Sequence, residues 1–98
     1  MSSTRRVLQS TPRFERALRR FVAGNAERQR CVAETLRRME TNLYDPKLKT
    51  HALRGAFAGF HASSCGYDCR IVFGLRTDAK GGVEKIVLTS VGTHDEVY

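Results

Sequence analysis

The closing seven residues of the chain, Gly92 to Tyr98, bring an imidazole and a phenol together just after a predicted strand. His94 and Tyr98 stand four residues apart, so a single helical turn would place them on one face. Imidazole suits proton transfer because its ordinary pKa of about 6.5 leaves both forms available near neutral pH. An aromatic ring suits stacking on an unpaired base of RNA. These residues therefore predict chemistry on single-stranded RNA.

The charge of the chain favours a partner that carries phosphate. Seventeen Lys and Arg residues outnumber ten Asp and Glu residues, which gives a net charge of +7. Most of these cations are arginines, whose guanidinium groups bind phosphate oxygens bidentately. A charge that serves only solubility is the alternative. Charge alone does not separate RNA, DNA and an acidic protein as the partner.

Length and hydropathy limit the class of protein. Ninety-eight residues suffice for one domain, over 1–98, with a single core. No apolar run approaches the roughly 20 residues that a membrane helix needs. The basic N-terminus lacks the apolar stretch of a signal peptide. We therefore expect a cytoplasmic protein that does not bind a membrane.

The three cysteines, Cys31, Cys65 and Cys69, lack the paired spacing of zinc ligands. Cys65 and Cys69 flank a turn-like segment, so we expect them to lie near each other. Reduced, packed thiols are the favoured interpretation. A zinc site completed by His51 or His61 is the alternative. We expect no metal and no cofactor.

The elements that must position these groups follow from periodicity and capping signals. Thr11 followed by Pro12 is typical of a helix start, and Gly24 of a helix end. Asn25 is a natural cap for a second helix over about 26–43, so the two helices should form an antiparallel hairpin. Strands are predicted over 7–9, 59–63, 69–75 and 83–91.

Alternation in the strand over 69–75 separates two faces. Cys69, Ile71, Phe73 and Leu75 share one face, and Arg70 shares the other with Val72. The order strand, two helices, three strands predicts an α+β domain in which a consecutive antiparallel meander packs against the helical hairpin.

Three segments in order resemble a known family: His51 to Gly55, Asp68 to Phe73, and Gly92 to Tyr98. They are similar to segments of the RelE/ParE superfamily of toxins from type II toxin–antitoxin systems, in particular the RelE/StbE- and YafQ-like mRNA interferases. The resemblance covers nearly the whole chain. It implies a RelE-like fold with a mainly antiparallel twisted sheet. It also implies a ribosome-dependent endoribonuclease that cleaves mRNA by attack of the 2′-OH, without a metal, and so inhibits translation.

The resemblance also assigns roles to single residues. His51, Asp68, His94 and Tyr98 match positions implicated in cleavage by YafQ-like enzymes, and Arg70 matches an arginine that holds phosphate. Asp68 either acts as a base or orients Arg70. YafQ-like proteins carry a further histidine about where this chain has Ser64. The residues predicted to contact RNA are Lys47, Lys49, Arg54, His61 and Arg76.

The predicted partners are mRNA, the ribosomal A site and a cognate antitoxin, which is acidic and partly disordered, in a toxin–antitoxin hetero-oligomer. The antitoxin or ribosomal RNA would bind the arginines of the helical hairpin. Two other functions stay open: a ParE-like inhibitor of DNA gyrase, and a cleavage-inactive relative that binds antitoxin or RNA. The arginines of this surface are Arg13, Arg16, Arg19, Arg20, Arg28, Arg30, Arg37 and Arg38.

Overall fold

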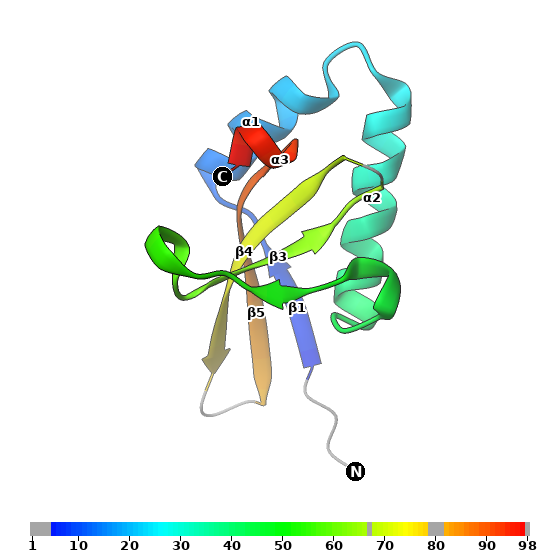
Figure 1. The fold of residues 1–98 in the computed structure, drawn as a ribbon. Helices are drawn as coiled ribbons and strands as arrows, with labels where there is room; N and C mark the ends of the chain where they lie inside the picture. Colours follow the sequence, from blue (N-terminus) through cyan, green and yellow to red (C-terminus); the bar gives the residue numbers. More distant parts are fainter. Residues whose placement is uncertain (1–4, 67, 79–81, 98) are drawn as a thin grey trace.

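The computed structural model describes residues 5–66, 68–78 and 82–97. The two long helices lie on one side of a five-stranded sheet, as Figure 1 shows. The elements in chain order are β1 (Arg5–Gln9), α1 (Pro12–Val22), α2 (Ala26–Thr41), η1 (Pro46–Leu48), β2 (His51–Ala52), η2 (Gly55–Phe57), β3 (Phe60–Ser64), β4 (Arg70–Asp78), β5 (Val83–Gly92) and α3 (His94–Val97).

The strand order across the sheet is β1-β5-β4-β3-β2. β3, β4 and β5 form the predicted antiparallel meander, and β1 pairs in parallel with β5. The parallel pair requires a long crossover, which α1 and α2 begin. The two-residue β2 pairs with β3 at the edge and was not predicted. The structure therefore has the predicted α+β architecture with one additional edge strand.

Thr11 joins the start of α1 to the sheet. Its Oγ1 accepts the Phe14 N–H at 3.1 Å, which caps the helix, and donates to the Leu88 carbonyl of β5 at 2.7 Å. Pro12 follows as the first helical residue, where its missing N–H costs nothing. The capping signal in the sequence is confirmed, and the same hydroxyl fixes the helix on β5.

The two long helices form an open hairpin instead of a close antiparallel pair. Gly24 turns the chain in the left-handed region at φ +66°, and Asn25 then caps α2 by accepting the Arg28 N–H. Figure 1 shows α1 and α2 diverging from this corner. α1 packs mainly on β5, whereas α2 packs beside β1. Arg28 holds the corner because its guanidinium lies over the Phe21 ring and donates to the Phe21 carbonyl.

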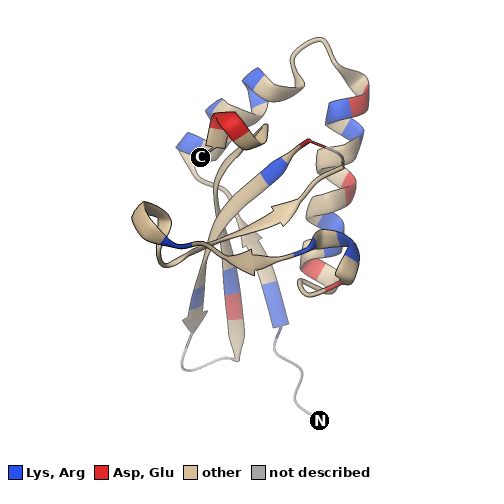
Figure 2. Cartoon of the chain, viewed as in Figure 1, with Lys and Arg blue, Asp and Glu red and all other residues tan. Residues whose placement is uncertain are grey.

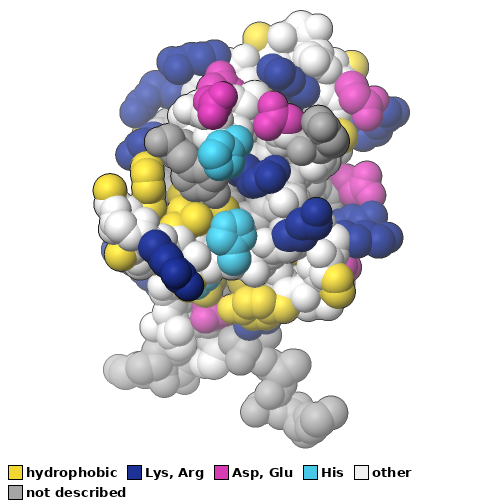
Figure 3. Space-filling model, in the orientation of Figure 1, with side chains coloured by type: hydrophobic (Ala, Val, Ile, Leu, Met, Phe, Trp, Pro, Cys, Tyr) yellow, Lys and Arg dark blue, Asp and Glu magenta, His cyan; other side chains and the backbone are white. Residues whose placement is uncertain are grey.

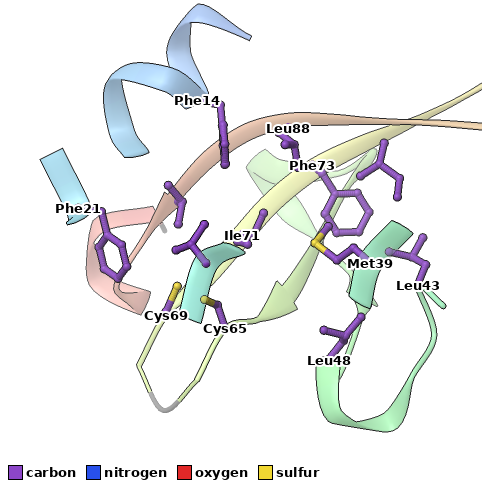
Figure 4. Packing of buried hydrophobic residues seen from close by; sticks show 13 residues of the cluster. Phe14, Phe21, Met39, Leu43, Leu48, Cys65, Cys69, Ile71, Phe73 and Leu88 are labelled. Atoms are coloured by element: carbon purple, nitrogen blue, oxygen red, sulfur yellow. The ribbon is translucent and has the colours of Figure 1, made fainter. Parts of the chain in front are cut away.

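The hydrophobic core fills the space between the helices and one face of the sheet. A bulge between Val72 and Phe73 shifts the register of β4 against β5, so that Phe73 pairs with Leu88 but Ile71 with Val91. Leu88 and Val91 can therefore both face the helices. Figure 4 shows this packing. Fully buried members of the core include Phe14, Met39, Leu43, Leu48, Ile71, Phe73 and Ile86.

Within the described part of the chain, no helix has both the length and the apolar character needed to cross a membrane. Figure 2 shows Lys and Arg residues spaced along α1 and α2, which agrees with the arginine surface predicted for the two helices.

Candidate functional site

The strand register aligns His51 with the open face of the sheet. His51 of β2 pairs with Ala62, Ala62 with Val72, and Val72 with Ser90 of β5. Directly opposed residues project to the same face. The flanking residues Ile71 and Phe73 lie in the core, so this row projects away from α1 and α2.

Arg70 shares this open face because it precedes Val72 by two residues in β4. It is half-buried, and it stands opposite Ser64 of β3 and Gly92 of β5. Its Nη1 donates to the carbonyl oxygen of Cys69 at 3.0 Å. That bond anchors the guanidinium, which has other N–H groups with which it can bind an anion.

His51 is exposed and has a defined proton arrangement. Its Nδ1 lies 2.9 Å from the carbonyl oxygen of Lys49, whose backbone is left-handed at φ 49°. A carbonyl can only accept, so Nδ1 carries the proton in the neutral ring. Nε2 is then the nitrogen that can take a proton from a substrate.

His94 begins α3, immediately after the end of β5. Glu96 Oε1 accepts the Thr93 N–H at 2.8 Å, and the Thr93 carbonyl accepts the Glu96 N–H, so the turn is held from both sides. The imidazole is mostly exposed, with Nδ1 3.6 Å from Asp95 Oδ1. Figure 3 shows histidine side chains near α3 and near β2 on one face, with basic side chains beside them.

A hollow of about 430 Å³ lies on the same face, between η2 and α3. Its apolar wall is formed by Phe57, Phe60, Val72 and Val97, and Ser90 adds a hydroxyl. Phe60 is one of the few large apolar side chains exposed among the described residues. Aromatic rings at an open, basic surface suit the stacking of unpaired bases.

Sequence reasoning missed this hollow. Its signal is the segment Gly-Ala-Phe-Ala-Gly-Phe over 55–60, in which two aromatic residues are spaced by glycines. Gly55 and Gly59 both have positive φ values, +65° and +93°, which bend the loop over the sheet.

Asp68 lies on the β3–β4 hairpin and is exposed. Among the described residues, no ion pair joins it to Arg70, which is bound to the Cys69 carbonyl instead. In this structure, therefore, no contact supports the suggestion that Asp68 orients Arg70. Tyr98, the predicted stacking residue of the tail, lies outside the described residues.

His61 is not placed with the other predicted residues. It pairs with Phe73 in the register and stacks on its ring at 5.6 Å, on the face that the helices cover. Its Nδ1 is buried and, within the described ranges, has no hydrogen-bond partner. His61, a predicted RNA contact, is thus half-buried on the covered side of β3, together with Ser63.

Arg76 also lies apart from the site. It is exposed on the same face of β4 as Arg70 but six residues along the strand, a separation of roughly 20 Å. Lys47, Lys49 and Arg54 are exposed near the β2 edge, as a basic rim. The structure therefore brings the β2 edge, Arg70 and His94 to one surface and leaves Arg76 at the far end.

A second surface cavity, of about 250 Å³, lies between α1 and β5. Arg13, Arg16 and Arg20 line it at helical spacing, and Glu96 of α3 faces them. Hydrogen bonds from Thr93 lower the pKa of Glu96 below its ordinary value, and the nearby Arg28 and Arg20 charges lower it further. This acidic side chain thus connects α3 to the arginine surface.

No group of three or more His, Cys, Asp or Glu side chains is arranged to hold a metal ion, as far as the described residues extend.

No protein-family model matches the sequence, and no curated protein sequence matches it. Solved structures do match. YafQ from E. coli superposes with a TM-score of 0.71 at 12% identity, over 95% of this chain and 98% of that one. YafQ matches again as part of the E. coli DinJ–YafQ toxin–antitoxin complex, with a TM-score of 0.69 at 12% identity, over 96% of this chain and 98% of that one.

Two further toxins are equally similar. A copper-bound mutant toxin from Helicobacter pylori has a TM-score of 0.71 at 20% identity, over 93% of this chain and 97% of that one. A YoeB/ParE toxin from Agrobacterium tumefaciens has a TM-score of 0.70 at 14% identity, over 89% and 97%. The chain therefore has the RelE-like fold of these toxins, as its sequence predicts.

Proposed function

We propose that the protein is the toxin of a type II toxin–antitoxin system and cleaves mRNA at the ribosomal A site. The observation that carries this proposal is that His51 and Arg70 share one open face beside an aromatic hollow, with His94 two residues after the Gly92 that pairs with Arg70. The likeness of the fold to YafQ and YoeB/ParE toxins supports it.

In the proposed reaction, a ribose 2′-OH attacks the adjacent phosphorus and the 5′ oxygen leaves. His51 takes the 2′-OH proton on Nε2, because Nδ1 is held by the Lys49 carbonyl. Arg70 neutralises the phosphate oxygens as charge builds on them. His94 gives a proton to the leaving oxygen. Each positioned acid or base typically contributes a factor of about 10²–10⁴.

Alignment of the RNA is the remaining requirement. β3 and β4 lie between the strand of His51 and the strand that leads to His94. The attacking 2′ oxygen and the leaving 5′ oxygen flank a single phosphorus atom, so one phosphodiester must be held within reach of both imidazoles, with the neighbouring base in the hollow. The ribosome would hold the message in this position, which accounts for the ribosome dependence that we propose.

The proposed protein partner is an acidic antitoxin. The E. coli DinJ–YafQ complex, in which a toxin of this fold is found with its antitoxin, supports an antitoxin as the partner. The arginine surface on α1 and α2 provides the complementary charge, and the cavity beside Arg13, Arg16 and Arg20 would receive an acidic side chain.

The test is induced expression of the wild type beside a His94→Ala variant, followed by mapping of the 5′ ends of cellular transcripts. We expect new ends within translated codons for the wild type and few for the variant. Growth arrest with intact message and induced DNA damage would instead indicate a gyrase inhibitor. No growth arrest from the wild type would indicate a cleavage-inactive relative, in which Ser64 stands opposite Arg70 where YafQ-like proteins carry a histidine.

A further inference from the structure

The three cysteines converge on one cavity, although they come from separate elements. Cys31 lies on α2, Cys65 follows β3, and Cys69 precedes β4. All three are free thiols, and all line a surface cavity of about 190 Å³ together with Asp68 and Arg28. Nothing in the proposed cleavage reaction uses them.

Cys65 and Cys69 are opposed across the β3–β4 hairpin. Ser64 pairs with Arg70, so the next residues inward along the hairpin are these two cysteines. The Cys65 N–H donates to the Cys69 carbonyl at 2.8 Å. Hydrogen-bonded residues opposed in an antiparallel pair have Cα atoms about 5.5 Å apart, within the range that disulfides span. Figure 4 shows the two side chains next to each other and pointing into the same space.

We propose that Cys65 and Cys69 form a redox-active dithiol that a hydroperoxide converts to an intramolecular disulfide. The proposal is independent of RNA cleavage, because it rests only on the hairpin and the cavity.

The reactivity of the three thiols is unequal. A hydrogen bond from the Cys69 thiol lowers the pKa of Cys65 to about 7, and the Thr35 hydroxyl contributes in the same direction. The pKa of Cys69 is raised, first because its proton is held in that bond. Burial and the neighbouring Cys65 raise the pKa of Cys31. Cys65 is therefore the attacking thiolate, Cys69 the resolving thiol and Cys31 a bystander.

The oxidation balances in two steps. The Cys65 thiolate attacks one peroxide oxygen, the O–O bond breaks, and the second oxygen leaves as hydroxide (or as an alkoxide from an organic peroxide). Cys65 is then a sulfenic acid. The Cys69 sulfur attacks the Cys65 sulfur, the S–O bond breaks, and the departing hydroxide takes the Cys69 proton to form water. The two thiols lose two electrons, and the peroxide gains them.

The cavity gives the oxidant a route to side chains that are otherwise buried. Cys65 and Cys69 are 1% and 5% exposed. Hydrogen peroxide is close to water in size, and the cavity that the two cysteines line has room for several such molecules. A bulky alkylating reagent does not fit this cavity, so folding should slow the labelling of these thiols by a large maleimide more than it slows their oxidation by peroxide, each rate being compared with that of the unfolded chain.

The dithiol lies directly behind Arg70. The Cys69 carbonyl accepts both the Cys65 N–H and the Arg70 guanidinium. A disulfide between Cys65 and Cys69 would therefore link β3 to β4 just before Arg70. It would also restrict the Cys69 carbonyl, which holds the Arg70 guanidinium.

Tryptic digestion tests the pairing directly, because the sequence has no Lys or Arg between Gly55 and Cys69. The full chain is treated with hydrogen peroxide, unfolded, alkylated and digested. We expect the peptide 55–70 to lose two hydrogen atoms and to escape alkylation, and the Cys31 peptide to be alkylated. Dithiothreitol should restore both thiols.

Three other outcomes overturn the proposal: an unchanged peptide 55–70, a peptide 55–70 linked to the Cys31 peptide, or oxygen atoms added to Cys31 first. Cys31→Ser is the matched control, and this variant should form the same disulfide. Cys69→Ser should stop at a sulfenic acid on Cys65 that dimedone traps. The wild-type peptide map decides the question even if a variant folds poorly.

Discussion

The Nδ1 atom of His51 lies 2.9 Å from the carbonyl oxygen of Lys49, and this contact determines which ring nitrogen is basic. The neutral ring must donate through Nδ1, so only Nε2 faces a substrate as a proton acceptor. The backbone of Lys49 is left-handed, which turns its carbonyl toward the ring.

A His51→Asn substitution separates the two nitrogens. The asparagine amide can still donate to the Lys49 carbonyl from about the place of Nδ1, but it has no counterpart of Nε2. We expect folding to be retained and cleavage to fall by a factor of about 10²–10⁴. Cleavage rates on messages in translating ribosomes measure the activity, and a thermal melt measures the folding. His61→Gln is the control, since His61 is on the covered face; equal loss in both variants would contradict the assignment.

Arg70 and Arg76 offer a matched pair on one face of β4. Lysine keeps the positive charge but cannot bind phosphate bidentately. We expect Arg70→Lys to weaken binding of a short RNA by a factor of about 10 to 150, because a charged hydrogen bond is worth about 1.5–3 kcal/mol. Arg76→Lys should leave binding unchanged, since it lies at the far end of the strand. Fluorescence anisotropy at a fixed salt concentration compares the RNA affinities of the two variants. Equal effects would mean that binding depends on the net charge of the surface and not on the position of Arg70.

The docking of α3 should depend on pH through Glu96. The pKa of this carboxyl in the folded protein lies below its ordinary value of 4.5, since the charged form accepts hydrogen bonds from Thr93. The stabilisation that the charged Glu96 gives to the docked α3 is therefore fully present at a pH above that ordinary pKa. It is lost as the pH falls through the lower pKa of the folded protein. Amide hydrogen exchange of α3 between pH 6 and pH 3 (about the window of this titration) should show α3 opening at the acid end. Glu96→Gln should remove the pH dependence, and a wild-type α3 equally protected at both ends would count against it.

Local signals predicted the helices better than they predicted the site. Thr11, Pro12 and Gly24 mark the ends of α1 by backbone chemistry that acts within a few residues. The bulge beside Val72 depends on how two strands pack, and β2 is too short to show a pattern. The inward face of β3 has no apolar pattern that the sequence could show, because His61 and Ser63 lie on it: Ser63 is buried there, with a hydrogen bond to Thr50 in place of an apolar contact.

The candidate site shows the same division. The residue types in the closing segment predicted proton transfer, but only strand pairing places His51 and Arg70 on one face and sets Gly92, two residues before His94, opposite Arg70. The aromatic hollow needed the loop over 55–60 to fold across the sheet, which depends on two glycines with positive φ. Long-range pairing of this kind leaves no local pattern in the sequence.

Gly92 controls how closely α3 approaches β5, and it can be tested against Gly74. Neither glycine has a positive φ, so neither needs glycine for its backbone. A Cβ at Gly92 would lie 3.1 Å from two atoms of Glu96 and 3.4 Å from Val97, whereas a Cβ at Gly74 would meet the Phe60 ring at 3.9 Å, an ordinary contact.

We therefore expect Gly92→Ala to push α3 away from the strand and to carry His94 with it. Cleavage should fall at least tenfold, since a displacement of about 1 Å at a reacting group can cost a factor of 10². The melting temperature should change little, because the core beneath α1 and α2 is untouched. Gly74→Ala should retain full cleavage and gain a few tenths of a kcal/mol from the stiffer unfolded chain. If both variants cleave like the wild type, then the position of α3 does not limit the reaction, and His94 is not the acid.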